Sequence, residues 1–305
     1  MEDRNRELVD DPTREGAAPD NRQDGEGHAA GRRTGELEAL FARFRAHAEA
    51  SLAEGGRKDV HQARVHARRL SVLLEAWGGE AAAKVLVQLK KSRKRLGRVR
   101  DADVLIAWLK HRREAARESG DGRMARLLKR MIRRRSAARA DGLEKLRRKL
   151  PRRLDKLERE WAVFRQESLP RLAEAADLSG ELARLEDKFE LRRLKYERAA
   201  IAEGADSGAA LGRLHKVRLA AKELRYTAEA AGDALDGRGW ERLTACKEIQ
   251  KQLGGINDIR FRLEAVSLAK PGKSGSSREA KMRLQAELKA ELKAGLEEVR
   301  LAKLP

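Results

Sequence analysis

The residues best suited to chemistry are histidine and cationic side chains that recur at the same helical spacing in two segments of the chain. His61 heads the first segment and His215 heads the second, 154 residues later. Positions three, seven and ten residues after each His share one face of a helix. Guanidinium groups bind two anionic oxygens at once, and ammonium groups act as compact charges, so these rows predict a surface that binds an anion. The two rows are His61, Arg64, Arg68 and Ser71, and His215, Arg218, Lys222 and Arg225.

A second pair of segments follows the first pair in each half and repeats at an offset of 157 residues. Both copies carry two lysines four residues apart, then a glycine and an aspartate. The aspartates are expected to orient a neighbouring Arg or Lys rather than to touch an anion. The glycines predict a close backbone approach or a bend, because glycine inside a helix costs about 1 kcal/mol relative to alanine. The copies are Lys90, Lys94, Gly97 and Asp101, and Lys247, Lys251, Gly254 and Asp258.

Apolar residues at spacings of three and four run beside all four polar rows and predict the helices that position them. The apolar stripes of the first pair are Val60, Ala63, Ala67, Leu70, Leu74 and Trp77, and Leu214, Val217, Ala221, Leu224, Ala228 and Ala231. Those of the second pair are Leu89, Ser92, Leu96, Val99, Ile106 and Leu109, and Cys246, Ile249, Leu253, Ile256, Leu263 and Val266.

The same periodicity predicts an all-α fold of two pseudo-symmetric four-helix bundles, without the alternating pattern of strands. The expected helices are 36–53, 58–77, 80–118, 122–165, 179–203, 208–234, 238–269 and 279–302. Residues 1–34 are expected to form a disordered tail, followed by a first bundle over about 36–176 and a second over about 177–302. Kinks or ends are expected at Pro151 and Pro170, turns at Gly204, Gly208 and Gly237, and a flexible linker over 271–277.

The composition of the 305 residues limits the function further. Lys and Arg number 69 against 49 Asp and Glu, a formal charge of +20, which predicts a polyanionic partner or an acidic surface. Aromatic residues make up only 4%, too few for repeated stacking on nucleic-acid bases. No apolar run is long enough to span a bilayer, and no signal peptide is evident, so a cytoplasmic protein without a membrane partner is expected. The single Cys246 is expected to be a buried thiol.

The two His-x-x-Arg-x-x-x-Arg/Lys helices, the Leu224-Arg225-Tyr226 ending and the two Leu-Gly-x-Val/Ile-Arg/Asn-Asp segments resemble the CHAD family, the conserved histidine α-helical domain. The resemblance covers roughly residues 36–302 and implies a CHAD domain over 35–302. It implies two four-helix bundles around a basic central cavity that binds inorganic polyphosphate, and association with polyphosphate granules as in some members. Ser71 departs from the family, which usually has a basic residue there, and Glu223 opposite Arg69 is a second asymmetry.

The resemblance and the repeated rows together assign a site that binds polyphosphate without catalysis, with no cofactor and no metal. His61 and His215 are expected to donate hydrogen bonds to phosphate or within the cavity, with a purely structural role as the alternative; His66 lies off the basic row. Neighbouring cations and the absence of further ligands disfavour a metal. The expected site residues are His61, Arg64, Arg68, Lys90, Lys94, His215, Arg218, Lys222, Arg225, Lys247 and Lys251.

Two other classes of function remain as alternatives. A polyphosphate-processing enzyme would need a nucleophile or convergent carboxylates for metal, and neither is found; Gly272-Lys273-Ser274 lacks the glycine and the preceding strand of a phosphate-binding loop. A basic helical scaffold or non-specific nucleic-acid-binding protein is kept open by basic runs such as 90–100 and 133–135. Polyphosphate length, oligomeric state and any protein partner stay undetermined by the sequence.

Overall fold

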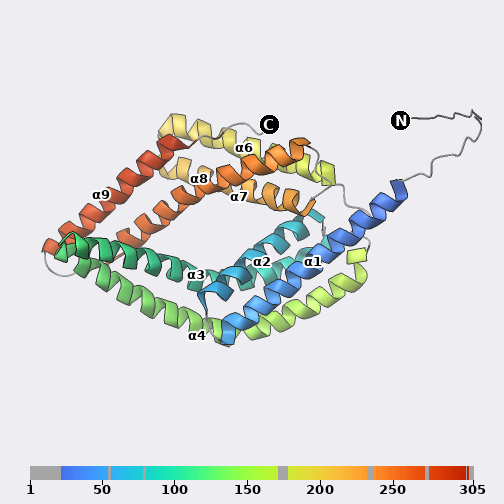
Figure 1. Ribbon diagram of the computed structural model, residues 1–305, viewed down its shortest axis with the longest axis horizontal. Coiled ribbons are helices and arrows are strands. Elements are labelled where there is room, and N and C mark those ends of the chain that lie inside the picture. Colours follow the sequence, from blue (N-terminus) through green and yellow to red (C-terminus); the bar gives the residue numbers. More distant parts are fainter. Residues whose placement is uncertain are drawn as a thin grey trace, which may run out of the picture.

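The computed structural model describes residues 22–53, 56–77, 80–170, 178–231, 237–271, 275–299 and 301, and their regular structure is helical throughout. The all-α prediction is therefore confirmed. Figure 1 shows the helices as a long, open ring. In chain order they are α1 (Arg22–Ala53), α2 (Arg57–Trp77), the short 3-10 helix η1 (Glu80–Ala82), α3 (Ala83–Glu118), α4 (Gly122–Glu167), α6 (Leu178–Glu203), α7 (Gly208–Ala231), α8 (Gly237–Ser267) and α9 (Gly275–Glu298).

Several details differ from the sequence-based expectation, and three of them concern α1, α4 and α9. Helix α1 begins at Arg22 and so includes residues 22–34, which were assigned to the tail, because an existing helix gains one backbone hydrogen bond for each residue it adds. Pro151 lies inside α4 and does not end it. Helix α9 begins at Gly275, so the linker expected over 271–277 is shorter than predicted; Ser277 is buried in that helix. Residues 1–21 and 272–274 lie outside the described residues.

The apolar stripes of α2 and α7 are buried as their spacing predicts. Every described side chain of both stripes is 3% exposed or less. The stripes of α3 and α8 are buried as well, apart from Leu263, which is half-buried. Since each polar row stands one residue after its stripe, burial of the stripe fixes the direction in which the row points.

Two of the buried clusters belong to single halves of the chain. One joins α1 and α2 to the first part of α3 and the second part of α4, with Phe41 stacked on Trp161 at 4.4 Å between ring centroids. The other joins α6 and α7 to α8 and the end of α9. In Figure 1, α1, α2 and α4 of the first cluster lie in the lower part of the ring, and α6, α7 and α8 of the second lie in the upper part.

The two halves meet at two separate places. Helices α2 and α7 contact each other near one place. At the other, the second part of α3 and the first part of α4 share a hydrophobic cluster with α8 and α9, including Leu109, Leu128 and Leu284. Both α3 and α4 are long enough to contribute to two clusters, so the halves are also joined at this second place. None of the described helices has the length and apolarity to cross a membrane.

Candidate functional site

The contact between α2 and α7 brings the two predicted basic rows together. Arg68 of α2 lies near enough to Arg218 and Lys222 of α7 that its charge lowers the pKa of both. Arg64 also contributes to the lowered pKa of Lys222. Side chains of the two rows therefore lie near one another across the junction of the two halves. That they form one anion-binding surface stays a prediction.

One further cation reaches this junction from α3. Arg93 is half-buried, and its pKa is lowered by burial and then by the charge of Arg68, while the carboxylate of Glu75 opposes the shift. Together these residues form what we call the central cationic cluster. Its members are Arg64, Arg68, Arg93, Arg218, Lys222 and Arg225.

Lys222 carries the strongest electrostatic effect in the cluster. Burial, followed by repulsion from nearby guanidinium groups, lowers its pKa from 10.5 to about 7. The ammonium is destabilised because it has lost water and gained like charges, and an anion placed among these groups would favour the charged form by its opposite charge. The guanidinium groups responsible are those of Arg218, Arg68, Arg225 and Arg64.

An unsatisfied donor also points to an anion. The Nε atom of Arg218 is buried and has no hydrogen-bond acceptor among the described residues. Buried donors are nearly always paired, so an unpaired guanidinium N–H is a site where a ligand oxygen is favourable. The pKa of Arg218 is lowered by burial and by Arg68, and the charge of Asp258 opposes this only in part.

Arg64 is held by contacts that its counterpart Arg218 lacks. Its guanidinium lies against Gly97 of α3, in the space that a Cβ on that residue would occupy. Its Nη2 lies 3.9 Å from Oδ1 of Asp101, which agrees with the expected orienting role of that aspartate. At Gly254 in the second half, no described atom lies within 4 Å of a Cβ position. The predicted close approach thus occurs at Gly97 alone, and it is made by a side chain.

The two histidines stand at the exposed edges of the basic rows. The pKa of His61 is lowered by partial loss of hydration, then by Arg100 and Arg64. The pKa of His215 is lowered in the same way, although a hydrogen bond with Asn257 opposes the shift. Both imidazoles are therefore neutral hydrogen-bonding groups at neutral pH.

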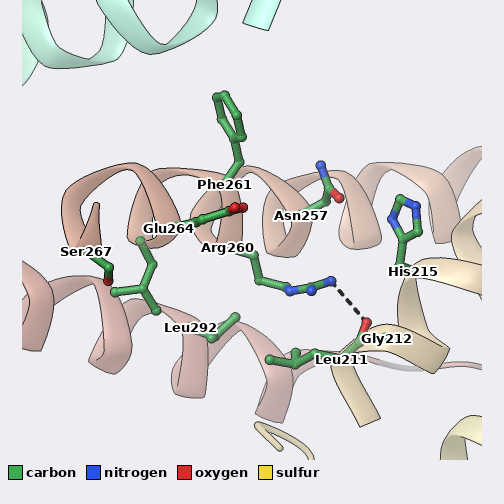
Figure 2. A pocket seen from close by; sticks show the side chains of 10 residues that line it. Leu211, Gly212, His215, Asn257, Arg260, Phe261, Glu264, Ser267 and Leu292 are labelled. Atoms are coloured by element: carbon green, nitrogen blue, oxygen red, sulfur yellow. Dashed lines mark hydrogen bonds between the residues drawn. The ribbon is translucent and has the colours of Figure 1, made fainter. Parts of the chain in front are cut away.

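A pocket of about 570 Å³ opens beside His215 between α7, α8 and α9. Figure 2 shows His215 and Asn257 at one end, and Arg260 donating from Nη1 to the carbonyl of Leu211 at 3.0 Å. Phe261 and Leu292 add apolar surface to its lining. A smaller recess that also includes Arg218 shares His215, Asn257 and Arg260 with this pocket, so the pocket borders the central cationic cluster.

Arg225 and Ser71, which occupy equivalent positions in the two rows, behave differently. The guanidinium of Arg225 lies over the ring of Tyr226 at 4.7 Å, and its Nε is 3.6 Å from Glu229. Ser71 is buried and donates from Oγ to the carbonyl of Ala67 at 2.7 Å. The asymmetry expected from Ser71 is therefore present, because α2 has no basic side chain at the position equivalent to Arg225.

The remaining predicted lysines are solvent-exposed. Lys90 lies close enough to Glu75 to influence the pKa of that carboxyl. Lys94, Lys247 and Lys251 are exposed on α3 and α8, and their participation in the site stays a prediction. His66 lies outside the cluster as expected, because its ring stacks on His47 at 5.6 Å. In the part of the chain that the structure describes, His, Cys, Asp and Glu form no metal-binding group of three.

Sequence reasoning missed four residues of this region. Arg100 and Asn257 lie beside the histidines and occupy the same place in the repeated Leu-Gly segments, so the repeat itself could have indicated them. Arg93 and Arg260 have no basic counterpart in the other half, because the equivalent positions are Gln250 and Asp103. Apart from their positions in helices, nothing in the sequence indicates that Arg93 and Arg260 belong to this region.

Comparison with known proteins agrees with the all-α fold. The chain is similar to PptA from Streptomyces chartreusis, with 19% identity, a TM-score of 0.65, and coverage of 88% of this chain and 96% of that one. It is also similar to the CHAD domain from the plant Ricinus communis, with 21% identity, a TM-score of 0.60, and coverage of 91% and 94%. No curated protein sequence matches. The model of the CHAD domain matches residues 36–267, more than half of the sequence, and the chain belongs to the CHAD family.

Proposed function

We propose that the protein binds inorganic polyphosphate, without processing it, at the central cationic cluster. The observation that carries the proposal is the convergence of five guanidinium groups and Lys222, supplied by both halves of the chain, around one place. A linear polyphosphate offers closely spaced anionic oxygens and no bases or sugars, so cation placement alone must recognise it. The CHAD resemblance supports the same ligand.

The roles of the side chains follow from their chemistry. Arg64 and Arg218 present planar forks to two phosphoryl oxygens, and the buried Nε of Arg218 provides one more donor for an oxygen. Lys222 contributes a compact charge that tolerates sliding of the chain. The neutral His61 and His215 donate hydrogen bonds at either end, with Arg100 and Arg260 beside them.

Absence of catalysis belongs to the same proposal. Hydrolysis of a phosphoanhydride bond commonly requires a positioned nucleophile or carboxylates that hold a metal. Asp101 lies beside Arg64 and Asp258 beside Arg218, and each acts as the partner of its guanidinium. We expect a cytoplasmic protein that associates with polyphosphate granules.

Titration calorimetry with long polyphosphate, pyrophosphate and duplex DNA at two salt concentrations tests the proposal. Long polyphosphate should bind most tightly, because it touches cations of both halves, and its affinity should fall as salt rises. Arg64→Gln with Arg218→Gln should weaken it by at least about tenfold, since each charge-assisted contact is worth about 1.5–3 kcal/mol. Equal affinity for DNA would favour the nucleic-acid alternative, and release of phosphate from polyphosphate would favour an enzyme.

A further inference from the structure

A second concentration of positive charge lies between α3 and α4. It lines a pocket of about 550 Å³, which we call the α3–α4 basic pocket. The buried side chain of Gln88 lines it too. The cationic lining residues are Arg95, Arg148, Lys149, Arg152, Arg153 and Lys156.

This pocket is separate from the central cationic cluster. Arg93 belongs to the cluster, whereas Arg95 lines the pocket. Two residues along a helix correspond to a rotation of about 200°, so the two arginines leave α3 on nearly opposite sides. Helix α4, which supplies the other cations, runs along the outer side of the ring, away from α7 (Figure 1). A single compact anion therefore cannot contact both the central cationic cluster and the α3–α4 basic pocket.

The hydrophobic core fixes the direction of the α4 cations. Leu146, Leu150 and Leu154 are buried at one-turn spacing. Lys149, Arg153 and Lys156 follow at spacings of three and four on the face next to these leucines, so they form one row along the pocket, and Arg148 and Arg152 line it from farther round the helix. The row is therefore a consequence of packing and is present before any ligand binds.

The positive charges of the pocket are not balanced within its lining, which contains no carboxylate. By contrast, other basic residues that contact α4 have acidic partners: Lys145 donates to Asp141 at 2.7 Å, and Arg45 of α1 contacts Glu158. The pKa of Arg95 is lowered by loss of hydration and then by the charges of Arg153, Arg98 and Arg148, which places these guanidinium groups near one another.

We propose that the α3–α4 basic pocket is a second anion site, which binds a compact ligand carrying several clustered phosphoryl groups. Six cations around a limited volume match several phosphoryl groups held close together better than a single charge. The lining has no aromatic side chain on which a base could stack, so recognition rests on the phosphoryl groups. The site does not depend on the function proposed for the central cationic cluster.

Calorimetric titration of variants with tripolyphosphate, and separately with inositol hexakisphosphate, tests the second site. Arg64→Gln and Arg218→Gln are first introduced together to weaken the central cluster. On that background, Arg148→Gln, Arg152→Gln and Lys156→Gln remove three charges from the pocket. The matched control removes three charges from exposed positions elsewhere on α4, by Lys129→Gln, Arg133→Gln and Arg159→Gln.

The control should keep one binding event for at least one of the two anions, and the pocket variant should lose at least about tenfold in affinity for the same anion. The anion bound more tightly identifies the source of the phosphoryl groups. Equal affinities for the pocket variant and the control would overturn the second site. Tighter binding of duplex DNA than of either anion, lost in the pocket variant, would overturn the assigned ligand class. If replacing only Arg64 and Arg218 left the affinity for polyphosphate unchanged, the function proposed for the central cationic cluster would be wrong, and this result is distinct from those above.

Discussion

The guanidinium of Arg64 occupies the space beside Gly97 that any larger residue would fill. Glycine at this position therefore leaves room for the guanidinium of an α2 arginine against α3. On the function proposed above, the cost of a glycine inside α3, about 1 kcal/mol relative to alanine, is offset by the placement of a group that binds the anion.

Replacing Gly97 by Ala should displace Arg64 without unfolding the chain, because the group in the way is the end of a flexible side chain. We expect polyphosphate affinity to fall by about tenfold, the value of one charge-assisted contact. Gly254→Ala is the matched control: its Cβ position is open, so affinity should be unchanged and helix α8 should become more stable. Equal affinities for the two variants would show that Arg64 does not need this position.

How much of this site the sequence predicts depends on the range of the interactions involved. The rows of α2 and α7 were predictable, because the period of a helix ties each polar row to its buried stripe. That the two rows face each other results from packing between helices that are distant in the sequence, which the repeat suggests but does not specify. Arg93 shows the limit: it joins the cluster only because α3 packs beside α2, and no second copy marks it.

Glu229 of α7 links the two halves through Arg69 of α2 and also pairs with Arg225. It accepts a hydrogen bond from Nη2 of Arg69 at 3.3 Å and lies 3.6 Å from Nε of Arg225. Glu229→Gln should lower the free energy of unfolding by about 0.2–1 kcal/mol, as for other partly exposed ion pairs. The same change should raise polyphosphate affinity, because Arg225 loses its carboxylate partner.

Thermal unfolding and calorimetry on the same samples check both effects of Glu229→Gln. The exposed Glu291 of α9 supplies the control, since Glu291→Gln removes an equal charge away from the junction. A variant at Glu229 that gained no more affinity than the Glu291 variant would mean that Arg225 does not contact the ligand.

Cys246 should be unreactive in the folded protein. Burial, with a further contribution from Glu186, raises the pKa of its thiol to about 12, and only the thiolate reacts with disulfide reagents. At pH 8 we expect modification of the native protein to be slower by orders of magnitude than modification in guanidinium chloride. Rapid modification of the native protein at pH 8 would show that α8 opens locally at this position.

Lys222 should make both stability and binding depend on pH. Its pKa is about 7 in the folded chain against an ordinary 10.5, so between these values the unfolded chain holds a proton that the folded chain has lost. The free energy of unfolding should therefore rise with pH across this window, and the full electrostatic cost is present below pH 7. Lys222→Met should remove this rise, which thermal unfolding measured from pH 6 to 10 would detect.

Polyphosphate binding should respond to pH in the opposite direction. An anion beside Lys222 restores the charged form, so above pH 7 binding must take up a proton, and affinity should decline as pH rises. Calorimetry at pH 8 in two buffers with different ionisation enthalpies should give an uptake approaching about one proton. That uptake should vanish in Lys222→Met and persist in Lys216→Met, which changes an exposed lysine of the same helix. Equal uptake in the two variants would mean that another group binds the proton.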